Sequence, residues 1–212
     1  MFDAYIFDLD GTLLDTIEDL TDAVNYALKE NNYPLRTIEE VKSFIGNGVA
    51  KLMERAVGVE KADVTKPLKD FKQYYLTHSD VKTKPYDGII ELLQELKNRG
   101  KKTAIVSNKM DEATKALAIT YFGGLIDVAI GENEAAGIRR KPATDSVELA
   151  LKQLGADKKS AVYIGDSDTD IQVALNANMT GISVLWGFRN ERFLRENGGV
   201  NFVKEPKEIL EF

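Results

Sequence analysis

A run of apolar residues that ends in two aspartates near the N-terminus constrains the fold of this chain more than any other feature. Residues 4–13 read AYIFDLDGTL, and the segment Ala4–Phe7 predicts a buried β-strand. Asp8 and Asp10 follow it, and Gly11 ends it. Ligands of open α/β sheets bind outside the carboxyl ends of the strands, and residues i and i+2 of an extended chain face the same way. We therefore expect both carboxylates in one ligand site, where a cation or a proton must relieve their repulsion.

Strand and helix patterns alternate over most of the remaining chain. Further buried strands are predicted at residues 103–106, 128–130, 161–164, 182–185 and 201–203. Helices are predicted between or before them, at about residues 89–99, 111–121, 145–154 and 169–177. This alternation predicts an α/β fold, with a Rossmann-like parallel sheet flanked by helices.

One all-helical block interrupts the alternation directly after the first strand. It spans residues 16–81 and includes a capping-box sequence at Thr37–Glu40 and a break at Gly46-Asn47-Gly48. We therefore expect an α/β core domain of residues 1–15 and 82–212, with an inserted helical cap domain of residues 16–81.

Composition excludes several classes of function. Acidic residues outnumber basic ones by 34 to 28, and no run of lysine or arginine suggests nucleic acid or a membrane surface. The chain has no cysteine, which rules out a thiol nucleophile and a disulfide framework. No stretch approaches the ~20 apolar residues of a membrane span, and no basic segment precedes an apolar one at the N-terminus. We expect a soluble, cytoplasmic protein without a signal peptide.

Three more segments place polar side chains where ligands could bind. Ser107-Asn108-Lys109 follows a strand and could cap the next helix or hold phosphate oxygens at its N-terminus. Arg139-Arg140-Lys141 could be a solvated charge run. Asp166-Ser167-Asp168-Thr169-Asp170 resembles the start of a calcium loop, but Ile171 and Ala177 replace the glycine and glutamate that such a loop needs at positions six and twelve.

Taken in order, the four segments resemble the four motifs of the haloacid dehalogenase (HAD) superfamily. The first is Phe-Asp-Leu-Asp-Gly-Thr-Leu at residues 7–13, and Ser107 matches the second. Lys141 with Pro142 matches the third, and Gly-Asp at 165–166 with Asp170 matches the fourth. The family is known for this core and, in one of its types, for a helical cap inserted at this place.

The resemblance implies a role for each of these residues. Asp8 would be the nucleophile that forms an aspartyl-phosphate, and Asp10 the general acid and base. The phosphoryl group would be bound by Ser107, Asn108, Lys141, Gly11 and Thr12. Mg²⁺ would be the cofactor, with Asp8, Asp10, Asp166 and Asp170 as its site.

The helical block carries a finer resemblance. Ile45 to Gly48, together with Leu52 to Ala56, is similar to the cap of the phosphoglycolate phosphatase subfamily. Two glycines let backbone approach a small anion, so Gly46, Asn47, Gly48 and Arg55 are the candidates for substrate selectivity. The turn could equally be a plain connection between two helices.

The expected activity is hydrolysis of a small phosphorylated metabolite by a monomer or homodimer, and the resemblance implies 2-phosphoglycolate as the substrate. A pyrophosphatase, a nucleotidase, and a sugar-phosphate phosphatase or mutase share the same core and stay open. A phosphonate hydrolase would need a Schiff-base lysine in the cap. The cap has several lysines, so this alternative stays open, but the Gly-Asn-Gly loop argues against it. A receiver-like signalling module phosphorylated on aspartate is the non-enzymatic alternative, but it would not need the helical insert.

Overall fold

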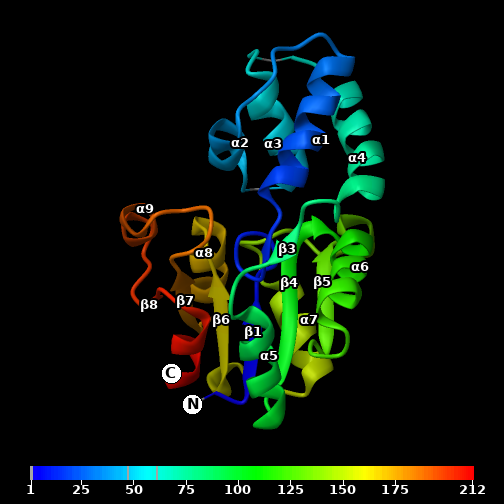
Figure 1. Ribbon diagram of the computed structural model, residues 1–212. Helices are drawn as coiled ribbons and strands as arrows, with labels where there is room; N and C mark the ends of the chain where they lie inside the picture. Colours follow the sequence, from blue (N-terminus) through cyan, green and yellow to red (C-terminus); the bar gives the residue numbers. More distant parts are fainter. Residues whose placement is uncertain (1, 47, 61) are drawn as a thin grey trace. The chain divides into compact units, whose positions relative to one another are not determined.

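The computed structural model describes residues 2–46, 48–60 and 62–212, and the chain divides into two compact units (Figure 1). The first consists of Met1–Leu14 and Pro85–Phe212, and the second of Asp15–Lys84. The second unit starts one residue before the predicted helical block and ends three residues after it. The chain crosses between the units at β2 (Leu14–Asp15) and β3 (Lys84–Pro85), which pair with each other.

The first unit is built on a six-stranded sheet, which confirms the predicted α/β class. Its strand order is β5-β4-β1-β6-β7-β8, and the neighbouring strands pair in parallel. The strands are β1 (Ala4–Phe7), β4 (Lys102–Met110), β5 (Val128–Glu132), β6 (Ala161–Gly165), β7 (Thr180–Val184) and β8 (Phe202–Val203). The sequence order reverses on either side of β1, and ligands of open α/β sheets bind at such a point.

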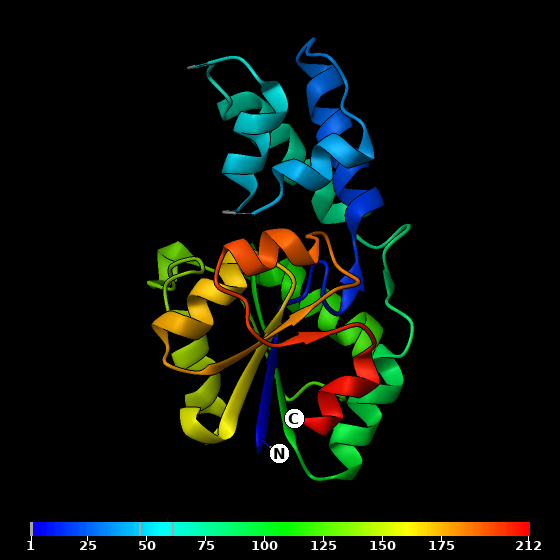
Figure 2. The same cartoon turned by 90° about the vertical axis from the view of Figure 1, so that its left-hand side faces the viewer.

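Helices cover both faces of this sheet, as Figure 2 shows. They are α5 (Ile89–Asn98), α6 (Asp111–Phe122), α7 (Asp145–Leu154), α8 (Asp168–Asn176) and α9 (Glu191–Glu196), with short 3₁₀ helices at Glu134–Ala136, Lys158–Ser160 and Pro206–Glu211. Tyr5 and Phe7 of β1 pack in one apolar cluster with α5 and α6, and Ala4 and Ile6 in another with α7 and α8. This alternation leaves β1 buried on both sides, as its continuous apolar sequence predicts.

Strand β4 is longer than predicted. The apolar pattern ends at Val106, but the extended chain continues to Met110, which pairs with Glu132 of β5 after a register shift. Ser107 and Lys109 are both buried on this extension. Its polar residues therefore belong to the strand itself, and the following helix has Met110 at its N-cap with no side-chain cap.

The second unit is helical. It contains α1 (Ile17–Glu30), α2 (Ile38–Phe44), α3 (Gly48–Val57) and α4 (Thr65–His78) around a core of its own. The predicted capping box at Thr37 and Glu40 is present, with Thr37 Oγ1 accepting from Glu40 N and Glu40 Oε2 from Thr37 N. The buried carboxylate of Asp19 in α1 accepts from the backbone N–H groups of Lys82 and Thr83, so the two ends of this unit are joined.

No helix among the described residues is both long and apolar enough to pass through a membrane.

Candidate active site

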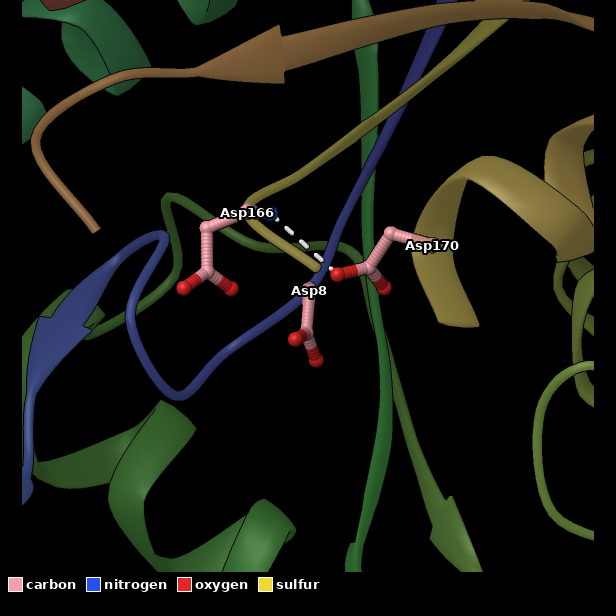
Figure 3. Close-up of side chains that lie close together, drawn as sticks. All are labelled: Asp8, Asp166 and Asp170. Carbon is pink, nitrogen blue, oxygen red and sulfur yellow. Dashed lines mark hydrogen bonds between the residues drawn. The ribbon is translucent and has the colours of Figure 1, made fainter. Parts of the chain in front are cut away.

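Three buried carboxylates converge at the carboxyl edge of the sheet (Figure 3). Asp8 follows β1, Asp166 follows β6, and Asp170 lies in the first turn of α8. Each contributes a carboxylate oxygen, and these oxygens lie within 4.8 Å of one another. Asp8 N donates to Ile164 O over 2.8 Å, which fixes the end of β1 against β6. The fold thus brings together side chains that are far apart in the sequence.

Lys141 supplies a buried positive charge to this cluster. Its Nζ lies 2.8 Å from Asp8 Oδ1 and 2.7 Å from Asp170 Oδ1, and its side chain is only 2 % exposed. The side chain of Asn108 fixes the backbone here, accepting from Lys141 N (2.7 Å) and donating to Lys141 O (3.2 Å). The ammonium is therefore fixed between two carboxylates, and it is not part of a solvated charge run.

Burial and like charges shift the pKa values of these groups. Burial, then the charge of Asp170, raises the pKa of Asp8 to about 7, although Lys141 opposes the shift. Burial and Asp170 likewise raise the pKa of the Asp166 carboxyl well above its ordinary value. Burial alone would lower the pKa of Lys141, but Asp170 and Asp8 raise it well above its ordinary value. One ammonium does not offset three buried carboxylates, so the site favours additional positive charge.

The loop after β7 closes tightly on Asp166. Asp166 Oδ2 accepts from Phe188 N over 2.6 Å. Gly11, at φ +85°, faces the same carboxylate, and a Cβ there would overlap it. A Cβ at Gly187 would overlap both Asp166 and the carbonyl of Gly11. The two glycines therefore permit a close approach that no other residue allows.

Asp170 is held by hydrogen bonds on both of its oxygens. Oδ2 accepts from Asp166 N and from the N–H and hydroxyl of Ser167, with which Asp170 forms the capping box of α8. Oδ1 accepts hydrogen bonds from Lys141 Nζ and, over 3.1 Å, from the buried hydroxyl of Tyr163. This arrangement favours Asp170 as a support for Lys141 and the Asp166 backbone over a direct metal ligand.

A second ion pair lies beside the cluster. Lys109 Nζ is 2.8 Å from Asp10 Oδ1, and their side chains are 4 % and 16 % exposed. Ser107 Oγ accepts from Lys109 N over 3.2 Å. Thr12 Oγ1 is buried and has no hydrogen-bond partner among the described residues. An unpaired buried hydroxyl is costly, so Thr12 can accept or donate a further bond to a bound group.

This donor set suits a hard divalent cation. Carboxylate and carbonyl oxygens are the ligands that Mg²⁺ prefers, usually with one or two carboxylates, waters and a substrate phosphate. Asp8 and Asp166 lie close together, and the pKa values of both carboxyl groups are raised. A bound cation would relieve the repulsion between the two carboxylates in place of protons.

The selectivity candidates lie in the other unit, and Asn47 lies outside the described residues. Gly46 and Gly48 have φ values of +115° and +81°, which glycine adopts without strain. Arg55 Nη1 donates to Phe44 O over 2.7 Å and approaches Gly46 O at 3.4 Å. Arg55 thus ties the loop to the C-terminal end of α2.

The sequence analysis did not predict the contact of the loop after β7 with Asp166, nor the contacts of Lys109 and Tyr163. Lys109 was expected only as the end of a polar triplet, and Tyr163 only as an apolar strand position. A signal for Lys109 exists, because residues i and i+2 of a strand face the same way and Ser107 was already a candidate. No sequence signal distinguishes the hydroxyl of Tyr163 from those of other strand tyrosines.

Comparison with known proteins agrees with this geometry. Residues 5–184 match the family of haloacid dehalogenase-like hydrolases. A phosphoglycolate phosphatase of Aquifex aeolicus is 34% identical over 184 residues, 86% of this chain and 84% of that protein. The pyrophosphatase PpaX of Listeria monocytogenes is 32% identical over 194 residues, 90% of this chain and 87% of that protein.

Solved structures give the same result for nearly the whole chain. The structure of a candidate phosphoglycolate phosphatase from Lactobacillus delbrueckii subsp. bulgaricus is 39% identical and superposes with a TM-score of 0.93, covering 99% of this chain and 97% of that one. The predicted family resemblance is therefore confirmed. The chain belongs to the haloacid dehalogenase-like hydrolases.

Proposed function

We propose that this protein is a Mg²⁺-dependent phosphatase that hydrolyses a small phosphomonoester, 2-phosphoglycolate, through an aspartyl-phosphate. The observation that carries the proposal is the position of Asp8. Its carboxylate is buried at the end of the central strand, close to two other carboxylates and 2.8 Å from the ammonium of Lys141. This is the environment that a nucleophile of phosphoryl transfer needs, because catalysis rests mainly on positioning and charge stabilisation.

In the first step, a carboxylate oxygen of Asp8 attacks phosphorus and the bond from phosphorus to the ester oxygen breaks. Asp10 gives its proton to the leaving oxygen, so an alcohol departs. In the second step, water attacks phosphorus, Asp10 takes its proton, and the bond between Asp8 and phosphorus breaks. Inorganic phosphate leaves, and Asp8 and Asp10 regain their first states.

The surrounding residues would bind the transferring group. Lys141 offsets the charge on Asp8 and on the phosphoryl oxygens. The hydroxyl groups of Ser107 and Thr12 and the backbone N–H of Asn108 would donate hydrogen bonds to those oxygens. Gly11 was predicted to join them, but its N–H already donates to Leu14 O over 2.9 Å. These roles are supported by the burial of Ser107 and the unpaired hydroxyl of Thr12.

A metal ion is part of this proposal. Asp8, Asp166 and the backbone carbonyl of Asp10 would hold Mg²⁺, with Asp170 as a nearby partner. When bound, Mg²⁺ supplies positive charge against the carboxylates and the phosphoryl oxygens. Its support is the buried cluster of oxygens and the upward pKa shifts of Asp8 and Asp166.

The helical unit would act as a cap that excludes water and helps to select the leaving group. The loop of Gly46, Asn47 and Gly48 is the candidate contact for a substrate carboxylate, with Arg55 holding the loop in place. The names of the relatives support 2-phosphoglycolate as the substrate.

Pyrophosphate is the second candidate substrate, because one relative of similar identity is a pyrophosphatase. The core chemistry would be the same, with phosphate as the leaving group instead of a hydroxy acid.

A phosphate-release screen tests the proposal. The purified protein is assayed with 2-phosphoglycolate, pyrophosphate, a nucleoside monophosphate, a sugar phosphate and p-nitrophenyl phosphate, each with Mg²⁺ and with a chelator. We expect Mg²⁺-dependent release that is fastest with 2-phosphoglycolate. Release from none of these compounds would reject the phosphatase proposal, and a clear preference for pyrophosphate would select the second candidate.

A further inference from the structure

A second buried cation lies beside Asp10, the proposed general acid and base. Lys109 is on the extension of β4, and its side chain is 4 % exposed. Its ammonium contacts Asp10, whereas Lys141 contacts Asp8 and Asp170. The two buried lysines therefore serve different carboxylates: Lys141 the proposed nucleophile, and Lys109 the proposed acid and base.

The position of Asp10 fixes what Lys109 can reach. A general acid lies within about 2.6–3.2 Å of the oxygen that it protonates. In the phosphate ester of a 2-hydroxy acid, one carbon separates that oxygen from the carboxylate, whose nearest oxygen is about 3 Å away. Lys109 Nζ is 2.8 Å from Asp10 Oδ1. A short acid that is placed for proton transfer therefore brings its carboxylate within reach of this ammonium.

We propose that Lys109 binds the carboxylate of the leaving group, so that the α/β core itself selects phosphate esters of short hydroxy acids. This inference rests on the proposed phosphatase function and adds a residue of the core to the loop of the helical unit. A charged hydrogen bond in a buried site favours an anionic leaving group over a neutral one of the same size. The side chain of Asp10 is 16 % exposed, so the Asp10 end of this buried ion pair reaches solvent.

The experiment compares two substrates that differ only in the charged group. 2-Phosphoglycolate carries a carboxylate, and 2-hydroxyethyl phosphate carries a hydroxymethyl group in its place. Values of kcat and KM for both are measured for the wild type, Lys109→Met and Lys109→Arg. Lys109→Met keeps the length of the side chain without its charge. Thermal unfolding checks that each variant folds, and Lys109→Gln takes the place of the Met variant if that protein is unstable.

We expect the ratio of the two kcat/KM values to fall roughly 10- to 150-fold in Lys109→Met, which is the range for loss of a charged hydrogen bond. The loss should be mainly in KM for 2-phosphoglycolate, and Lys109→Arg should keep part of the ratio. An equal loss of activity toward both substrates would overturn the proposal, because Lys109 would then only position Asp10.

Failure of this inference is distinguishable from failure of the proposed function. A wild type that hydrolyses both esters equally well would overturn the role of Lys109 and leave the phosphatase intact. A wild type that hydrolyses neither of them, nor any other phosphomonoester, would reject both.

Discussion

The ammonium of Lys141 lies 2.8 Å from the carboxylate of Asp8, and groups from β4, β6 and α8 hold it there. It also approaches Asp170 Oδ1 at 2.7 Å, the hydroxyl of Tyr163 at 3.0 Å and the carbonyl oxygen of Val106 at 3.2 Å. These four contacts restrict rotation of the Lys141 side chain, so the ammonium keeps its position during the reaction. It therefore acts as a preorganised charge, which costs no reorganisation during the reaction.

This arrangement predicts a positioning role for Tyr163. Tyr163→Phe removes the hydroxyl that accepts a hydrogen bond from Lys141 Nζ and keeps the ring in the core. We expect kcat to fall about 3- to 15-fold with KM nearly unchanged, because one hydrogen bond of about 1 kcal/mol orients the ammonium. Tyr5→Phe, in another buried strand position on the opposite face of the sheet, is the matched control and should keep wild-type kinetics. A change of KM alone in Tyr163→Phe would contradict this role.

Metal dependence follows from the buried carboxylates. Exhaustive chelation should abolish turnover, and Mg²⁺ should restore it. Ca²⁺ should inhibit, because it accepts more oxygens in looser geometry and could hold Asp8 through both carboxylate oxygens. The test measures phosphate release at a fixed substrate concentration, after each ion is added to the chelated protein. Undiminished turnover after chelation would remove the metal from the account.

The metal-free protein should lose stability as the pH rises. The carboxyl of Asp8 has an ordinary pKa of 3.8 and a folded-state pKa of about 7, because burial and Asp170 favour its neutral form. The folded state thus binds more protons than the unfolded state between these values. The contribution of Asp8 to the free energy of unfolding is complete below about pH 3.8 and is lost as the pH rises through about 7.

Thermal unfolding of the chelated protein at pH 5.5 and pH 8 tests this prediction. Asp8→Asn, which cannot titrate at this position, should show a smaller difference between the two pH values. Added Mg²⁺ should raise the unfolding temperature more at pH 8, where it does not compete with protons. Equal pH dependence in the wild type and Asp8→Asn would contradict the shift assigned to Asp8.

The sheet was predictable because its strands are buried on both faces. Continuous apolar runs such as Ala4–Phe7 and Ala161–Ile164 then give a strong signal, and their alternation with helices sets the class. The extension of β4 was not predictable in the same way. Residues 107–109 of this extension are polar although Ser107 and Lys109 are buried, so periodicity and hydropathy indicate a loop there.

The motifs identified which residues converge, but not how each is held. The sequence predicts carboxylates at Asp8, Asp166 and Asp170 as one site, and their oxygens lie within 4.8 Å. It does not reveal that Asp170 accepts hydrogen bonds on both oxygens, or that Lys109 reaches Asp10. Such contacts depend on side-chain directions, which periodicity does not encode, and the Lys109–Asp10 contact joins residues that are 99 positions apart.

Selectivity should also depend on the loop of the helical unit. Gly48→Val places a branched side chain at a φ of +81°, a conformation that strains the backbone of any residue but glycine. We expect kcat/KM for 2-phosphoglycolate to fall roughly 10- to 150-fold more than that for p-nitrophenyl phosphate, which has no carboxylate. Equal losses with both substrates would show that the loop is a plain connection between α2 and α3.

Substitution of Asp8, the proposed nucleophile, should remove activity without unfolding the protein. Asp8→Asn keeps the shape of the side chain but cannot attack phosphorus, so turnover should fall by at least about 10³-fold in a folded protein. Asp168→Asn, which changes a partly exposed aspartate at the start of α8, is the matched control and should retain activity within about twofold.

Chemical trapping of the intermediate tests this claim most directly. The protein is mixed with Mg²⁺ and substrate, treated with borohydride, which reduces an acyl phosphate to an alcohol, and digested for mass spectrometry. The account predicts homoserine at position 8 in the wild type and in Asp168→Asn, only when substrate is present, and none in Asp8→Asn. Reduction at Asp10 or at another carboxylate instead of Asp8 would contradict it, as would full turnover by Asp8→Asn.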